Sequence, residues 1–284
     1  MLKLIECPRD AMQGLHEFIP TEVKAAYINQ LLKTGFDTID FGSFVSPKAI
    51  PQMRDTAQVL SKLNLDTTST KLLSIVANKR GADDASQFDE IDYLGFPFSI
   101  SETFQKRNTN SSIEESFARV EVIQNLCVKN NKELVVYLSM AFGNPYGDHW
   151  DLEVAANWGR RLYNDLGVKI IALGDTIGVS NHENITKLFT GLMSELPEVE
   201  FGAHLHSTPD SVREKVAAAY EAGCRRFDGA IKGFGGCPMA KDDLTGNMPT
   251  EGMIAYFDNN QINTDIDADE FQKSMRMALD VFPK

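Results

Sequence analysis

Short runs of β-branched and other apolar residues recur eight times along the chain, and each is followed by a longer segment with helical periodicity. The strands that the pattern predicts are Leu2–Cys7, Thr38–Gly42, Lys71–Val76, Ile91–Phe96, Leu134–Met140, Lys169–Leu173, Glu200–His206 and Arg226–Ile231.

The segments between the strands carry apolar residues at helical spacing. Glu22–Leu32 and Ser112–Val128 each place their apolar residues on one face, which predicts two amphipathic helices. A third helix is predicted after the seventh strand, with Thr208 as its cap, Pro209 as its first residue and Gly223 at its end.

Strict alternation of strand and helix, repeated eight times in 284 residues, predicts an α/β fold of the (β/α)8 TIM-barrel type. A doubly wound parallel sheet is the alternative. No linker or low-complexity stretch divides the chain, so we expect a single domain over residues 1–284. The tail from Asp267 through Phe282 predicts one extra C-terminal helix outside the barrel.

Charge and composition exclude several classes of protein. The chain has 28 basic and 40 acidic side chains and a net charge of −12, which disfavours a dedicated nucleic-acid binder. No window approaches eighteen consecutive apolar residues, and the N-terminus lacks the apolar stretch of a signal peptide, so we expect a cytoplasmic protein with no membrane contact. The four cysteines include no CxxC pair, which predicts free thiols.

Polar side chains gather where the predicted strands end, and in a TIM barrel the chemistry takes place at that end. The candidates are Arg9, Asp10 and Gln13 after the first strand, Asp40, Ser46 and Lys48 after the second, Asp175 after the sixth, His204 and His206 on the seventh, and Cys237 and Asn247 after the eighth.

His204 and His206 give the sharpest signal, because residues i and i+2 of a strand point the same way and two imidazoles can converge on one ion. Asp10 and the amide oxygen of Asn247 can add hard oxygen ligands, and this mixture favours octahedral Mg²⁺ or Mn²⁺ over tetrahedral Zn²⁺. The alternatives are two hydrogen-bonded histidines inside the barrel and an Asp10 that caps a helix.

Other candidates have a functional and a structural interpretation. Arg9 could stabilise an oxyanion or form a surface ion pair. Asp175 could lie at the barrel mouth, as a carboxylate behind the metal ligands or as a proton carrier, or it could cap a helix. Cys237, in a glycine-rich loop, could act as a positioned acid or base, and Lys48 could bind an anionic group or be simply solvated.

Several stretches together resemble the 3-hydroxy-3-methylglutaryl-CoA lyase family. They occur in the family's order over nearly the whole chain: Pro8–Gln13, Ser43–Lys48, Pro51–Met53, Asn110–Phe117, Leu173–Val179, His204–His206, Gly235–Pro238 and Gly246–Asn247. The barrel and the His-x-His pair are shared with the wider group of metal-dependent aldolases and Claisen-type synthases.

The resemblance implies cleavage of hydroxymethylglutaryl-CoA, an acyl-CoA thioester, to acetyl-CoA and acetoacetate, and it suggests a homodimer. It implies a divalent ion, Mg²⁺ or Mn²⁺, on Asp10, His204, His206 and Asn247. It further implies catalytic roles for Arg9, Asp40, Asp175, His204 and Cys237, and substrate binding by Arg9, Gln13, Ser46 and Lys48.

The chain departs from the family pattern at several positions. Asp40 replaces a usual Glu, Ser207 replaces a common Asp, and Met140 and Asn144 stand where cysteines are frequent. These changes leave open a related 3-hydroxyacyl-CoA substrate, an aldolase or synthase that uses a 2-oxo acid, and a non-catalytic barrel kept as a binding protein.

Overall fold

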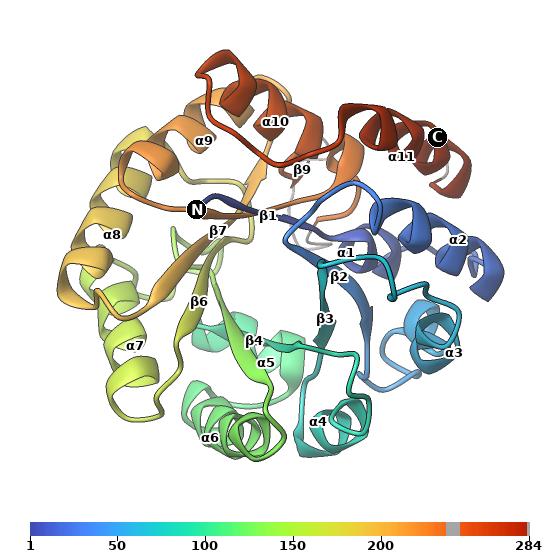
Figure 1. Ribbon diagram of the computed structural model, residues 1–284. Coiled ribbons are helices and arrows are strands. Elements are labelled where there is room, and N and C mark those ends of the chain that lie inside the picture. The colour runs from blue at the N-terminus through green and yellow to red at the C-terminus, as the bar shows by residue number, and fades with distance from the viewer. Residues whose placement is uncertain (237–244, 283–284) are drawn as a thin grey trace.

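Eight parallel strands form a closed barrel in the computed structural model of the protein, which describes residues 1–236 and 245–282 (Figure 1). The strands are β1 (Lys3–Glu6), β2 (Thr38–Ser43), β3 (Lys71–Ile75), β4 (Tyr93–Ser99), β5 (Glu133–Ser139), β6 (Ile170–Asp175), β7 (Glu200–Ser207) and β8 (Arg226–Gly229). Pairing of β1 with β8 and of β6 with β7 closes the sheet, so the TIM barrel is confirmed and the doubly wound sheet is excluded.

The helices lie around the barrel, most of them in an outer ring (Figure 1). They are α1 (Pro8–Gln13), α2 (Thr21–Leu31), α3 (Thr56–Leu60), α4 (Lys79–Ala85), α5 (Glu102–Thr109), α6 (Ile113–Lys129), α7 (Leu152–Asn164), α8 (His182–Glu195), α9 (Val212–Glu221), α10 (Thr250–Asn259) and α11 (Ala268–Val281), with short 3₁₀ turns at Pro51–Met53 and Ile231–Gly233. The predicted C-terminal helix is α11, which packs against α2 outside the barrel. Within the described residues, no helix is both long and apolar enough to cross a membrane.

The predicted start of the helix after β7 is wrong by three residues. The helix begins at Val212, and Pro209 lies in the turn before it. The Ser211 amide donates to the Thr208 carbonyl at 3.1 Å, and the Thr208 amide donates to Ser211 Oγ at 3.0 Å. Because this local turn uses the groups that a Thr cap would need, the helix starts only after it.

The strands have an apolar outer face and a mixed inner face. Side chains on the outer face pack against the helices and form the main core, as Ile39, Leu94 and Phe227 do. The inner face carries a small apolar cluster at mid-barrel, formed by Leu73, Ile75, Tyr93, Val135, Tyr137, Ile170 and Ala172. Successive side chains of a strand alternate between the two faces. The inward-pointing residues that follow this cluster along the strands therefore lie at one mouth of the barrel.

Candidate metal and substrate site

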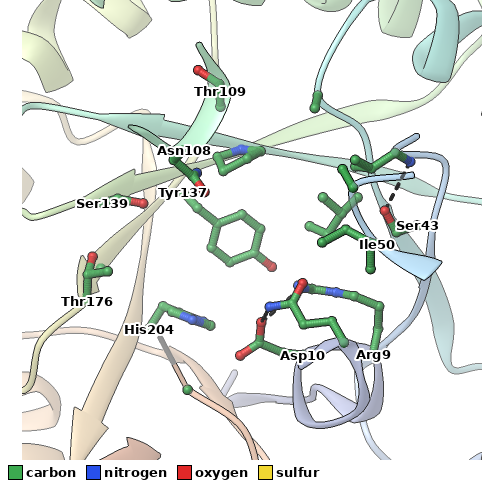
Figure 2. A pocket seen from close by; sticks show the side chains of 18 of the residues that line it. Arg9, Asp10, Ser43, Ile50, Asn108, Thr109, Tyr137, Ser139, Thr176 and His204 are labelled. Atoms are coloured by element: carbon green, nitrogen blue, oxygen red, sulfur yellow. Dashed lines mark hydrogen bonds and ion pairs between the residues drawn. The ribbon is translucent and has the colours of Figure 1, made fainter. Parts of the chain in front are cut away.

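A cavity of about 250 Å³ opens at the carboxyl ends of the strands (Figure 2). Charged and imidazole side chains gather on one side of it, where Arg9 and Asp10 lie beside His204. Apolar and small polar residues complete the wall; they include Val45, Ile50, Ile75, Pro97, Phe104, Asn108, Thr109, Tyr137, Ser139 and Thr176. The cavity therefore combines a polar end with a largely apolar body, as small-molecule sites commonly do.

Three of the four predicted metal ligands meet in this cavity. Asp10, His204 and His206 offer one ligand atom each, and these atoms lie within 4.8 Å of one another. The two histidines come from β7, and Asp10 comes from the first turn of α1. His206 is buried, and its Nδ1 has no hydrogen-bond partner among the described residues. A buried nitrogen without a partner fits a group that binds an ion.

A short ninth strand brings the fourth predicted ligand to the same place. β9 (Gly246–Asn247) pairs antiparallel with β7 and sets Asn247 opposite His206. The Asn247 amide nitrogen donates to Asp10 Oδ2 at 2.8 Å and to the Phe234 carbonyl at 2.9 Å. Two imidazoles, a carboxylate and an amide form a donor set that suits a hard or borderline divalent ion, so the residues fit the predicted metal.

His204 is oriented by a carboxylate that the sequence analysis missed. His204 Nδ1 lies 3.1 Å from Oδ2 of Asp228, which is buried on β8. This contact leaves the second ring nitrogen of His204 for the cavity. Burial lowers the pKa of His204, but the hydrogen bond and charge of Asp228 outweigh it and the net shift is upward. Burial and the nearby His204 lower the pKa of His206 to about 4, so His206 is neutral.

Arg9 lines the cavity and is held in place by three polar side chains. Its Nε lies 3.1 and 3.0 Å from the two oxygens of Asp40, and its Nη2 also donates to Asp40. Its Nη1 donates to Asp10 at 2.8 Å and to Gln13 at 2.9 Å. Arg9 is buried, so the alternative of a surface ion pair is excluded. Asp40 does not line the cavity; it holds the guanidinium that does.

The carboxylates around Arg9 titrate differently. Burial raises the pKa of Asp40 to about 6, although Arg9 opposes this rise. Burial also acts to raise the pKa of Asp10, but Arg9 and then His204 outweigh it, and the net shift is downward. Asp10 is therefore ionised and available to a cation near neutral pH.

Asp175 is not placed where the sequence analysis expected it. Its neighbours Gly174 and Thr176 line the cavity, so strand alternation turns Asp175 to the opposite face. Its oxygens accept hydrogen bonds from Lys215 Nζ at 2.7 Å and from the amides of Val179 and Ser180 at 2.8 and 3.0 Å. Asp175 is therefore a buried brace in this structure, and it does not line the cavity.

The remaining predicted residues lie at or beyond the rim. Gln13 lines the cavity and donates to Asp10 at 2.6 Å. Ser46 and Lys48 are exposed on the loop after β2; Ser46 lines a neighbouring cavity of about 530 Å³, and Lys48 lines neither cavity. Cys237 lies outside the described residues, whereas Gly236, just before it, lines the main cavity.

Comparison with known proteins agrees with this geometry. A family model described as HMGL-like matches residues 3–277. The chain belongs to this family. It is 33% identical over 267 residues to the rat protein named cytoplasmic 3-hydroxy-3-methylglutaryl-CoA lyase, covering 94% of this chain and 77% of the relative. It is 32% identical to the Bacillus subtilis protein named hydroxymethylglutaryl-CoA lyase YngG, covering 91% of this chain and 85% of the relative.

Solved structures of the same family superimpose closely on the chain. An HMG-CoA lyase from Acinetobacter baumannii, described in complex with coenzyme A and 3-methylmalate, has a TM-score of 0.90 at 31% identity, with 99% of this chain and 91% of that chain covered. The Bacillus subtilis HMG-CoA lyase has a TM-score of 0.90 at 30% identity, with 97% and 91% covered.

Proposed function

We propose that this protein cleaves hydroxymethylglutaryl-CoA to acetyl-CoA and acetoacetate. The observation that carries the proposal is the convergence of Asp10, His204 and His206 in one cavity beside the buried guanidinium of Arg9. The relatives named for this activity support it, since they match over nearly the whole chain.

Asp10, His204, His206 and Asn247 would hold a divalent ion, which we propose to be Mg²⁺ or Mn²⁺ on the basis of their nitrogen and oxygen donors. When bound, such an ion supplies Lewis acidity to the substrate's hydroxyl and acyl oxygens. His204 cannot serve as a general base in the same state, because Asp228 occupies one ring nitrogen and the ion would occupy the other.

The cavity residues divide the proton and charge transfers of the retro-Claisen reaction. Asp10 is the only carboxylate among the described residues that line the cavity, but its oxygens accept from Arg9, Gln13 and Asn247, so we assign it to the ion and not to the proton of the tertiary hydroxyl. Loss of that proton lets the carbon–carbon bond break, and negative charge grows on the thioester oxygen. Arg9, fixed by Asp40, stabilises this charge without reorganising. Cys237 would then protonate the departing acetyl-CoA carbon, as the family resemblance implies.

The mouth of the barrel is suited to an anionic thioester in spite of the net charge of −12. Arg9 and a bound divalent ion make the local potential positive, and at physiological ionic strength charges beyond about 8 Å are largely screened. Gln13 holds Arg9 and Asp10 in a fixed relative position. We propose that Ser46 and Lys48, on the exposed loop, contact the coenzyme A portion of the substrate. A homodimer and a cytoplasmic location remain predictions.

The test is a comparison of substrates with purified protein supplied with Mg²⁺. Release of acetyl-CoA is measured with hydroxymethylglutaryl-CoA and with a second 3-hydroxyacyl-CoA, and release of free coenzyme A is measured in a mixture of acetyl-CoA and a 2-oxo acid. We expect turnover of hydroxymethylglutaryl-CoA to exceed the other two reactions. Faster condensation with the 2-oxo acid would move the protein to the synthases, and no turnover with any substrate would support a non-catalytic barrel.

A further inference from the structure

A second group of ligand atoms lies inside the barrel, next to the first. Cys7, His204 and Asp228 offer one sulfur, nitrogen and oxygen atom each, and these atoms lie within 4.8 Å of one another. Cys7 and Asp228 are 1% and 2% exposed, and neither lines the cavity. The two groups share His204, whose Nδ1 faces Asp228.

The chemistry of this inner group differs from that of the outer group. A thiolate, an imidazole and a carboxylate are the ligands of zinc, and around a tetrahedral zinc ion such atoms are roughly 3.4 to 3.7 Å apart. The ligand atoms of the inner group lie within 4.8 Å of one another, and His204 Nδ1 and Asp228 Oδ2 are 3.1 Å apart, close to that spacing.

Asp228 and Cys7 each have a ligand atom that makes no strong hydrogen bond within the described residues. Asp228 Oδ1 is buried and has no hydrogen-bond partner in the described part of the chain, so Asp228 could bind through both oxygens. The Cys7 sulfur makes a long contact of 4.0 Å with the Ile5 carbonyl.

The electrostatic surroundings of Cys7 favour a cation. The carboxylates of Asp228, Asp40 and Asp10 lie close enough to act on the Cys7 thiol. The same carboxylates attract a divalent ion, which would displace the thiol proton to solvent as the sulfur–metal bond forms.

We propose that Cys7, His204 and Asp228 form a second metal site, selective for a soft divalent ion such as Zn²⁺, and that this inner site and the outer site exclude each other. A neutral imidazole has one lone pair. When Nδ1 of His204 binds zinc, the other ring nitrogen keeps the proton and cannot bind the outer ion. Zinc would then inhibit the enzyme by taking His204 from the outer site, a consequence that rests on the proposed function.

The experiment uses Co²⁺ as a spectroscopic probe for zinc in chelator-treated full-length protein. A thiolate ligand gives a charge-transfer band in the near ultraviolet, whereas nitrogen and oxygen ligands do not. We expect the band in the wild type, its loss in Cys7→Ala, and its retention in Cys127→Ala, a buried cysteine on α6. Absence of the band from the wild type would overturn the proposal.

The remaining cysteines make the assignment independent of whether Cys7→Ala folds. The chain has four cysteines. A band that survives separate removal of Cys127, Cys224 and Cys237 must come from Cys7, whereas a band that disappears in Cys237→Ala overturns the proposal. None of these spectra depends on turnover, so they report on the inner site even if the lyase assay fails.

Exclusion between the two sites is tested by inhibition of the Mn²⁺-loaded enzyme. We expect the zinc concentration for half-inhibition to rise at least about tenfold in Cys7→Ala relative to the wild type, with Cys127→Ala unchanged. Equal inhibition of all three proteins would contradict mutual exclusion, and an inactive wild type would instead contradict the proposed lyase function.

Discussion

Replacement of Asp228 by Asn tests how the outer metal site is built. The change keeps the shape of the side chain but removes the charge that faces His204 Nδ1 at 3.1 Å. A hydrogen bond to a charged acceptor contributes about 1.5–3 kcal/mol and one to a neutral acceptor about 0.5–1.5 kcal/mol, so the loss is about 1–1.5 kcal/mol. At about 1.4 kcal/mol per tenfold, this weakens metal binding by roughly tenfold, at the lower end of the range for residues that orient metal ligands.

The assay is a titration of chelator-treated protein with Mn²⁺, followed by electron paramagnetic resonance of the free ion. The matched control is Glu6→Gln, which replaces another buried acidic side chain of the barrel with its amide. Glu6 lies on β1 but contacts the Thr250 hydroxyl and the Ile231 amide, away from His204. We expect a wild-type Kd in the control. A wild-type Kd in Asp228→Asn, or an equal loss in Glu6→Gln, would refute the orienting role.

Three further predictions follow from other buried charges. Arg9→Lys keeps the charge but cannot hydrogen-bond to Asp40 through two nitrogens. We expect kcat, measured as acetyl-CoA release, to fall by at least about a hundredfold while the protein stays folded. Burial raises the pKa of Glu6 to about 8, so its folded-state pKa lies above the unfolded value and the free energy of unfolding falls as pH rises from about 4.5 towards 8. In melting curves measured over this pH range, we expect the melting temperature of Glu6→Gln to fall less than that of the wild type. Lys215→Met leaves the buried Asp175 carboxylate without its cation and should lower the free energy of unfolding by about 3–5 kcal/mol in urea titrations; an unchanged midpoint would contradict a bracing role.

The barrel could be predicted because buried parallel strands leave a strong apolar signal. All eight predicted strands are present, with ends that differ from the prediction by a few residues. The start of α9, at Val212, shows the limit of such signals. Thr208 and Pro209 are good helix-start residues, but the hydrogen bonds between Thr208 and Ser211 stabilise a turn instead.

The site could be predicted in part, because side chains that follow strands must gather at one mouth of a barrel. Asp10, His204 and His206 are brought together as expected. The prediction for Asp175 was wrong because the sequence does not show which of the alternating residues of β6 point into the barrel. Gly174 lines the cavity, so its neighbour Asp175 points away from it.

Asp228 was missed because its partner is on another strand, so nothing near it in the sequence reveals the contact. A weaker signal was present: Arg226 and Asp228 alternate on a buried strand, where charged residues at i and i+2 are unusual. Tyr137 gave no signal, because an aromatic residue is common in a strand. Its ring lies edge-on to His204, with ring centres 5.2 Å apart.

The most direct measurement is acetyl-CoA release from hydroxymethylglutaryl-CoA by chelator-treated protein as Mn²⁺ is added back. Turnover should be absent without metal, should rise to a plateau as one ion binds per chain, and should stay near zero in His206→Ala over the same range. Turnover that is complete without metal, or equal in His206→Ala and the wild type, would contradict a catalytic role for the ligands at the barrel mouth.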